Sequence, residues 1–174
     1  MAKAKKDQVS FYLGNKNLPV PETNFEWTPE MVEDLERARK SILHFARFFY
    51  IVNLDEGKQP IKLYPYQKRI LKALVENRFN VVLASRQIGK TTILTIFALW
   101  MVCFHDDFRV LLIANKETTA INIFKRIRLA YEMLPNYMKP GVIEYAKTGL
   151  VLANGSSIGT VSYTHLTLPT NREV

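Results

Sequence analysis

Hydrophobic positions recur at helical spacing in the first part of the chain. After Thr28 the apolar residues follow one another at steps of four and three, and they are Met31, Leu35, Ala38, Ile42, Phe45 and Phe49. This spacing predicts one amphipathic helical segment whose apolar face packs into a core. Thr28 suits an N-cap and Pro29 the first helical position, so the helix is expected to begin there. Residues 1–26, which include Leu18-Pro19-Val20-Pro21, are expected to form an irregular lead-in.

Later segments alternate between strand and helix patterns. After a polar loop from Asn53 to Pro60, a second helix is expected near Pro65. The order that follows predicts a βαβ unit with a right-handed crossover and a parallel sheet. The continuous apolar run Val110–Ile113 indicates a strand that is buried on both faces. The expected elements are a buried strand at 81–84, a helix at 91–103, a strand at 108–114 and a helix from 117 to 134.

A hairpin pattern follows the last of these helices. Val142–Tyr145 and Leu150–Ala153 are typical of strands, and Asn154-Gly155 is typical of a two-residue hairpin turn. Ser156–Val161 would then be the returning strand. The sequence therefore predicts an α/β fold in which a helical segment precedes the sheet.

Composition narrows the class of protein. The 174 residues suffice for about one domain, and the single cysteine, Cys103, excludes an internal disulfide. The longest apolar run has 12 residues, Ile93–Phe104, which is too short to cross a bilayer, so no membrane partner is expected. The formal net charge of +8 favours a polyanionic partner, nucleic acid first. Three scattered histidines lack the spacing of a metal site.

The stretch VVLASRQIGKTTI, residues 81–93, has the pattern of a phosphate-binding loop. Backbone N–H groups at a helix start can hold an anion, a lysine can reach the terminal phosphates, and a threonine hydroxyl can bind Mg²⁺. Gly89, Lys90 and Thr91 supply these groups, although Ala84 stands where the usual pattern has its first glycine. Arg86 could offset charge on a γ-phosphate. An ordinary strand-to-helix turn with a solvent-facing Arg86 is the alternative.

A second group of residues lies 23 positions before Lys90. In LYPYQ, residues 63–67, the Gln67 amide could bond to an adenine edge and the Tyr66 ring could stack on a base. Core packing would explain Tyr66 equally well. One helix could bring Gln67 back to the nucleotide.

Together these motifs resemble the large terminase subunit of tailed bacteriophages, the ATP-driven motor that packages viral DNA. The residues that carry the resemblance are LYPYQKRIL, VVLASRQIGKTT, VLLIANKETTAINIFKRI and LVLANGSSIGT, within 28–160. The resemblance implies a RecA-like P-loop NTPase domain of the additional-strand type over residues 27–160, present here incompletely. It implies that Lys90 and Thr91 hold phosphate and Mg²⁺, that Arg86 senses the γ-phosphate and that Tyr66 and Gln67 read adenine. The expected ATP-binding residues are Tyr66, Gln67, Ser85, Gln87, Gly89, Lys90, Thr91 and Thr92.

The same resemblance implies partners and a location. Double-stranded DNA, the portal ring and the small terminase subunit would be the partners, in a homo-oligomeric ring formed at the capsid. The protein would act in the host cytoplasm and, transiently, at the procapsid portal. A superfamily-two helicase shares both motifs, and a basic DNA-binding module with a vestigial loop is a third reading.

The sequence departs from the family pattern after the hairpin. The family has a strand ending in Asp-Glu there, followed later by a nuclease, and the sequence contains neither. Weak nucleotide binding and little hydrolysis are therefore expected. The final stretch VSYTHLTLPTNREV, residues 161–174, resembles translated adaptor sequence, and it is expected to be a non-native tail.

Overall fold

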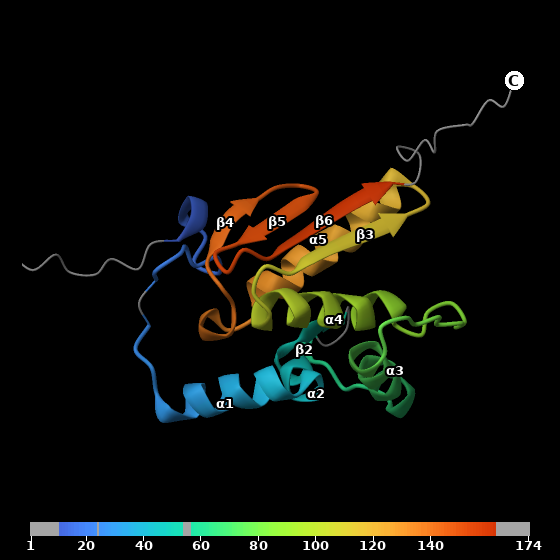
Figure 1. Ribbon diagram of the computed structural model, residues 1–174, viewed down its shortest axis with the longest axis horizontal. Helices are drawn as coiled ribbons and strands as arrows, with labels where there is room; N and C mark the ends of the chain where they lie inside the picture. Colours follow the sequence, from blue (N-terminus) through green and yellow to red (C-terminus); the bar gives the residue numbers. More distant parts are fainter. Residues whose placement is uncertain (1–10, 24, 54–56, 163–174) are drawn as a thin grey trace, which may run out of the picture.

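A helical layer lies beneath a four-stranded sheet in the computed structural model, which describes residues 11–23, 25–53 and 57–162 (Figure 1). Helices α1, α2 and α3 form the lower layer, α4 lies between them and the sheet, and α5 packs behind the sheet. The helices are α1 (Pro29–Lys40), α2 (Ile42–Phe45), α3 (Pro65–Glu76), α4 (Lys90–Phe104) and α5 (Glu117–Met133), with 3₁₀ turns at Tyr12–Gly14, Ala46–Phe48 and Asn136–Met138.

The first helix begins at its predicted cap but ends earlier than its apolar pattern suggests. The Thr28 hydroxyl accepts a hydrogen bond from the Met31 N–H at 3.3 Å. The chain becomes extended at Ser41, whose hydroxyl caps the short helix α2. Two helices therefore replace the single helical segment that was expected to run to Phe49. The break lets the apolar residues of both helices face α4, and the Trp100 indole of α4 donates to the Ala38 carbonyl at 2.9 Å.

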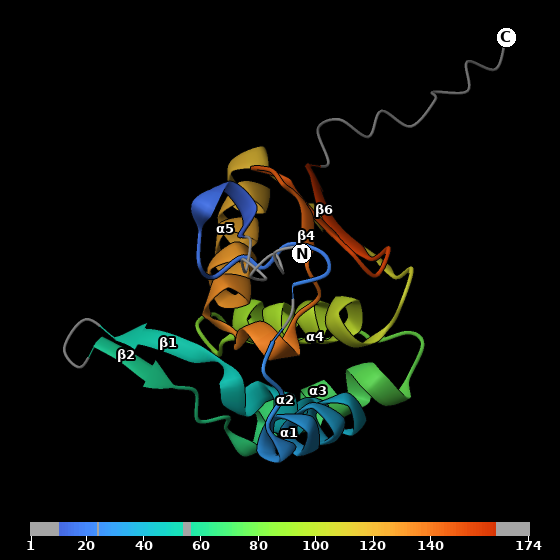
Figure 2. The same ribbon diagram turned by 90° about the vertical axis from the view of Figure 1, so that its left-hand side faces the viewer.

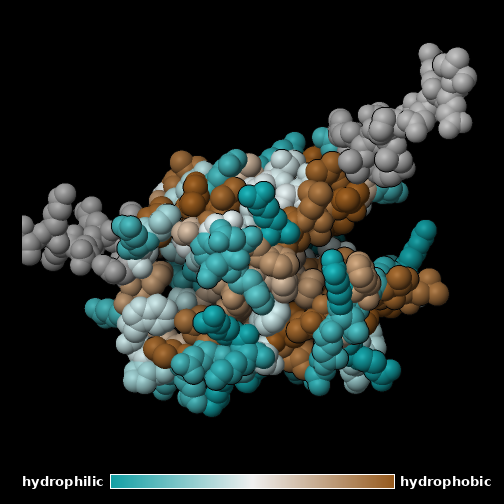
Figure 3. All heavy atoms as spheres, viewed as in Figure 1, coloured by the Kyte–Doolittle hydropathy of each residue, from teal (hydrophilic) through white to brown (hydrophobic). Residues whose placement is uncertain are grey.

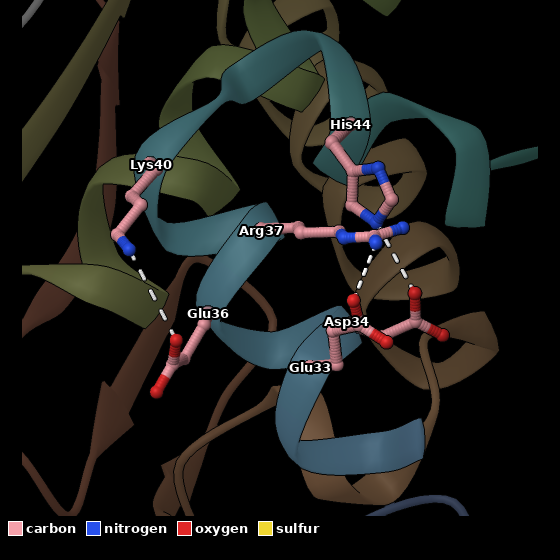
Figure 4. Close-up of polar contacts among 6 residues, drawn as sticks. All are labelled: Glu33, Asp34, Glu36, Arg37, Lys40 and His44. Atoms are coloured by element: carbon pink, nitrogen blue, oxygen red, sulfur yellow. Dashed lines mark hydrogen bonds and ion pairs between the residues drawn. The ribbon is translucent and has the colours of Figure 1, made fainter. Parts of the chain in front are cut away.

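The outer face of α1 carries charges that pair with one another (Figure 4). Arg37 pairs with Glu33 one turn earlier, and Lys40 lies 4.0 Å from Glu36. These pairs neutralise two of the basic side chains on this helix.

Four of the described strands form a mixed sheet in the order β3-β6-β5-β4. Only β3 and β6 are parallel, and β5 is antiparallel to both β6 and β4. The prediction of a parallel sheet is therefore wrong for the strands described, whereas the α/β class is confirmed. The antiparallel part consists of β4, β5 and β6, which follow one another in the chain and are joined by short turns. The bounds are β3 (Arg109–Ala114), β4 (Val142–Tyr145), β5 (Gly149–Leu152) and β6 (Ser157–Ser162).

The core lies between the sheet and the helices. Helix α5 covers one face of the sheet, and its predicted inner residues Ala120, Phe124, Ile127 and Tyr131 are buried together with Leu134 just beyond its end. The apolar helix α4 lies against both layers, which explains why apolar residues occur all around it. Its fully buried side chains include Ile96, Leu99 and Val102.

Strand β3 is covered on one face only, contrary to the prediction from its apolar run. Exposure alternates along the strand, and Leu111 and Ile113 are more than half exposed. Helix α5 packs against β3 on the face opposite to these exposed side chains. In addition, β3 is an edge strand, since among the described residues only β6 pairs with it. Figure 3 shows the resulting hydrophobic surface near β3 and β6 and over the loop before α4.

The predicted buried strand at 81–84 is also wrong. Residues 81–85 form no strand, and the side chains of Val81 and Leu83 are 99% and 100% exposed. A strand needs a neighbour to pair its N–H and C=O groups. No strand of the described residues lies beside this segment, so the apolar run alone does not produce the strand.

A two-stranded hairpin overlaps the polar loop predicted at Asn53–Pro60 and begins three residues before it. Strands β1 (Tyr50–Asn53) and β2 (Gly57–Pro60) are antiparallel, and the hairpin projects from the body of the molecule (Figure 2). Strand β1 is mostly apolar and β2 mostly polar, so neither segment shows the alternation typical of a strand, and the sequence indicated a loop from Asn53 onward.

The described part of the predicted lead-in, residues 11–23 and 25–26, has a single 3₁₀ turn and is attached to the sheet and to α5. The Val142 N–H donates to the Pro19 carbonyl at 2.7 Å, and Leu18 is buried. The Lys139 ammonium donates to the carbonyls of Asn17, Tyr131 and Glu132. Burial lowers the pKa of Lys139 to about 8.

The predicted non-native tail begins inside the sheet. Val161 and Ser162 belong to β6 and pair with Ile113 and Ala114. The remaining tail residues, 163–174, lie outside the described residues. In the described part of the chain, no helix is both long and apolar enough to cross a membrane.

Candidate functional site

The predicted phosphate loop follows the exposed residues 81–83 and runs from Ala84 into the first turn of α4. Two of its residues have left-handed backbone conformations, Gln87 with φ 64° and Gly89 with φ 83°. Glycine adopts this conformation without steric cost, and a residue with a Cβ does so less readily. Gly89 is the N-cap of α4, so the loop ends where the helix begins.

The first turn of α4 provides the positive end of a 15-residue helix. The first intrahelical bond described runs from the Ile93 N–H to the Gly89 carbonyl at 3.0 Å. The N–H groups that precede Ile93 have no carbonyl one turn earlier within the helix. Together with the helix dipole, they favour an anion at this position.

The Lys90 side chain folds back over the loop. Its ammonium donates to the Ala84 carbonyl at 3.0 Å and to the Ser85 carbonyl. The positive charge therefore lies over the backbone of the loop, as a phosphate ligand would require. Its partners are carbonyl groups of a solvent-accessible loop, which an anionic ligand can replace at small cost.

The structure brings Tyr66 and Gln67 to the loop, as the predicted helix implied. The Tyr66 hydroxyl donates to the Ile88 carbonyl at 3.1 Å, and Gln67 Nε2 donates to the same oxygen at 3.0 Å. The Tyr66 ring stacks on the Tyr64 ring, with centroids 5.7 Å apart and planes at 6°. The predicted contacts of Tyr66 and Gln67 with adenine remain a prediction.

The other predicted residues differ in exposure. Ser85, Arg86 and Gln87 are exposed, whereas Thr91 and Thr92 are half-buried on the first turn of α4. The described residues provide no ion-pair partner for Arg86, so its guanidinium is available to a ligand. Thr92 lines a cavity of about 330 Å³ between α4 and α5, together with Thr95 and Arg126.

The sequence did not indicate the roles of Tyr64 and Ile88. The Tyr64 N–H donates to Gln67 Oε1 at 3.0 Å, and this contact orients the amide. The available signal was the spacing Tyr64-x-x-Gln67 at a helix start, which is that of a capping box with glutamine at N3. The Ile88 carbonyl acts through the backbone, and such a role has no side-chain signature.

Cys103 is unsuited to nucleophilic chemistry. Burial raises the pKa of its thiol to about 12, so the reactive thiolate is strongly disfavoured. The described residues contain no group of three or more His, Cys, Asp and Glu side chains that could hold a metal ion. The only metal ligand predicted from the sequence, the Thr91 hydroxyl, would bind Mg²⁺ as a single oxygen beside phosphate oxygens, which is a usual arrangement for that ion.

The segment that contains the phosphate loop matches a known family. Residues 81–170 match the family model described as terminase large subunit, T4likevirus-type, N-terminal. The match covers more than half of the 174 residues and begins at the segment that leads into the phosphate loop. Helices α1 to α3, with Tyr66 and Gln67, lie before it.

Proposed function

The chain belongs to the T4likevirus-type terminase large subunit family, in its N-terminal part, and from this premise we propose that it binds ATP with Mg²⁺ at the loop 84–92. In the full packaging machine, ATP hydrolysis would drive double-stranded DNA into a capsid. The observation that carries the proposal is the Lys90 ammonium held over the loop, directly after Gly89 and at the positive end of α4.

Each group of the loop has a stated task in this proposal. The N–H groups at the start of α4 and the Lys90 ammonium would hold the phosphates. The Thr91 hydroxyl would be a ligand of Mg²⁺, and the metal would supply charge neutralisation between phosphate oxygens. Arg86, exposed on the loop, would approach the γ-phosphate. Ser85, Gln87 and Thr92 would border the nucleotide, and Tyr66 and Gln67 would meet the adenine.

Partners and location follow from the family as proposals. Terminase large subunits serve DNA packaging, so double-stranded DNA, a portal ring and a small terminase subunit are the expected partners. The protein would form a homo-oligomeric ring on the capsid and work in the host cytoplasm at the procapsid portal. The net charge of +8 supports a polyanionic partner.

Titration with a fluorescent ATP analogue in the presence of Mg²⁺ tests the proposed site. Removing a charge-assisted contact costs about 2–3 kcal/mol, so Lys90→Ala should weaken binding roughly 30- to 150-fold. Lys72→Ala, which removes an exposed lysine from α3, is the matched control and should leave the dissociation constant unchanged. Equal affinities for wild type and Lys90→Ala would contradict the site, and DNA binding without nucleotide binding would support the basic-module reading.

Hydrolysis by this chain is expected to be slow. The sequence has no Asp-Glu pair after Gly155, and a positioned carboxylate that activates water typically contributes about two to four orders of magnitude in rate. Phosphate release measured with Mg-ATP should therefore remain near the background, even at nucleotide concentrations that saturate the site. Rapid release that depends on Lys90 would show that another group of this chain activates water.

A further inference from the structure

One carbonyl oxygen joins the first turn of α3 to the phosphate loop. The Ile88 carbonyl accepts hydrogen bonds from the Tyr66 hydroxyl at 3.1 Å and from Gln67 Nε2 at 3.0 Å. Ile88 stands directly before Gly89 and Lys90 in the chain. The Ile88 carbonyl and the Gly89 N–H belong to one planar peptide group. Holding the carbonyl therefore fixes the direction of the Gly89 N–H and the orientation of the first turn of α4.

The Gln67 amide is oriented by the protein before any ligand is considered. Its oxygen accepts from the Tyr64 N–H at 3.0 Å, so its nitrogen must face the loop. The side chain is only 7% exposed. Both ends of the amide are thus engaged, one in capping α3 and the other in holding the loop.

The contact between helix and loop is also sterically tight. A Cβ placed on Gly89 would lie 2.7 Å from Gln67 Nε2, closer than side-chain carbons are found in real structures. Gly89 therefore lets the loop approach Gln67, in addition to providing the positive φ. This close approach is what the hydrogen bond from the Gln67 amide to the loop requires.

We propose that Tyr66 and Gln67 are positioning residues that hold the phosphate loop through the Ile88 carbonyl, and thereby strengthen binding of the polyphosphate chain itself. This inference rests on the proposed function, since it assigns a second role within the same site. A contact with adenine alone would affect only ligands that carry a base. A positioning role affects every ligand that enters the loop, with or without a base.

A ligand without a base separates the two roles. Isothermal titration would compare Mg-ATP with Mg-tripolyphosphate for wild type, Gln67→Glu and Tyr66→Phe. Glutamate at position 67 can still accept from the Tyr64 N–H, so α3 stays capped, but its carboxylate cannot donate to the Ile88 carbonyl. Gln67→Glu should weaken both ligands by a similar factor, about tenfold, and Tyr66→Phe by about threefold.

Tyr64→Phe is the matched control. It removes an exposed hydroxyl but keeps the ring stacked on Tyr66 and the backbone N–H that orients Gln67. Neither dissociation constant should change. If Gln67→Glu and Tyr66→Phe weaken Mg-ATP but leave Mg-tripolyphosphate unchanged, the positioning role is overturned and base recognition remains.

The rate of proteolysis in the loop tests the positioning role without any ligand. Arg86 is exposed in the loop, and trypsin cleaves after arginine. Loss of the contacts at Ile88 should raise the rate of cleavage after Arg86 severalfold in Gln67→Glu and Tyr66→Phe, relative to wild type and Tyr64→Phe. Equal cleavage rates would overturn the inference. Failure of the wild type to bind either phosphate ligand would instead contradict the proposed function.

Discussion

Two turns of this molecule place a glycine at positive φ close to the start of the next element, and they use their polar groups differently. Gly89 precedes α4 with φ 83°, and Gly155 precedes β6 with φ 78°. A Cβ on either glycine would contact a side chain from a distant segment, Gln67 for Gly89 and Asp107 for Gly155. The two turns therefore share a glycine at positive φ and differ in the polar contacts around it.

The polar groups of the Gly155 turn bond within the protein. Asn154 Nδ2 donates to the carbonyls of Val102 and His105 at the end of α4, at 2.8 and 3.2 Å. The buried Ser156 hydroxyl donates to the His105 carbonyl and accepts from the Phe108 N–H. This turn completes the C-terminus of α4, so its role is structural.

The Gly89 loop bonds far less with the rest of the protein. Its described bonds to distant residues are those at the Ile88 carbonyl, and the Lys90 ammonium bonds only to carbonyls of the loop. The N–H groups at the start of α4 face no carbonyl within their helix. The Gly89 loop thus leaves N–H donors available, as the proposed phosphate site requires, whereas the Gly155 turn bonds its polar groups within the fold.

The largest expected difference between the two turns is the loss of folding stability when Asn154 is replaced. Asn154→Ala removes the side-chain partner of the Val102 carbonyl and of the Ser156 N–H, and leaves the His105 carbonyl with the Ser156 hydroxyl as its donor. It should lower the free energy of unfolding by about 2–3 kcal/mol. Urea denaturation measures this loss, while the affinity for Mg-ATP should remain at the wild-type value. Asn80→Ala, which removes an exposed amide bonded to the Asn77 carbonyl, is the control and should cost less than about 0.5 kcal/mol.

A smaller effect is expected when each glycine is replaced by alanine. The left-handed conformation costs a residue with a Cβ about 1–2 kcal/mol. Since a Cβ on Gly155 would also lie 2.1 Å from Asp107 Oδ1, Gly155→Ala should reduce stability by at least that amount and leave nucleotide affinity intact. Gly89→Ala should change stability less, because its Cβ would approach only the end of the Gln67 side chain, and should weaken Mg-ATP binding roughly tenfold. Paired denaturation and titration of both variants would measure this. The same pattern in both variants would break the comparison.

The smallest effect concerns alkaline pH and the region where the lead-in meets α5. Burial raises the pKa of Cys103 from 9.0 to about 12 and raises the pKa values of Tyr131 and Tyr145 above 10.0, whereas it lowers that of Lys139 from 10.5 to about 8. Groups with raised pKa stabilise the fold below their unfolded values and lose this contribution as the pH rises. Lys139 acts oppositely, since its folded pKa is depressed and stability therefore increases with pH between about 8 and 10.5.

The three raised groups should outweigh Lys139 above about pH 9. The melting temperature should therefore fall between pH 9 and pH 11, and Cys103→Ala should begin its fall nearer pH 10, where the tyrosines ionise in the unfolded chain. Nucleotide affinity is not part of this prediction. A melting temperature that rises throughout this range would mean that Lys139 dominates instead.

Elements with local signals were predictable from the sequence. The Thr28 cap and the inner face of α5 were found because capping and helical periodicity depend on neighbours along the chain. The Asn154-Gly155 hairpin was found for the same reason, although its loop has three residues rather than two, since the Leu152 N–H bonds to the Ser156 carbonyl. The Gln67 side chain also reached the loop, as a helix from Pro65 implied.

Elements that depend on distant partners were not predictable. The apolar run at 81–84 has strand composition but no neighbouring strand among the described residues. The hairpin β1–β2 lacks an alternating pattern yet forms because its two segments pair with each other. The bonds from Asn154 to the end of α4 and from Gln67 to Ile88 join residues 52 and 21 positions apart, and no local pattern encodes such contacts.

A crystal structure of the chain with Mg²⁺ and a non-hydrolysable ATP analogue would show whether the loop around Lys90 binds a polyphosphate. Phosphate oxygens should lie at the N–H groups that begin α4, and the Lys90 ammonium should have moved from the carbonyls of Ala84 and Ser85 onto the phosphates. A nucleotide bound elsewhere, with Lys90 still on those carbonyls, would contradict the proposed site.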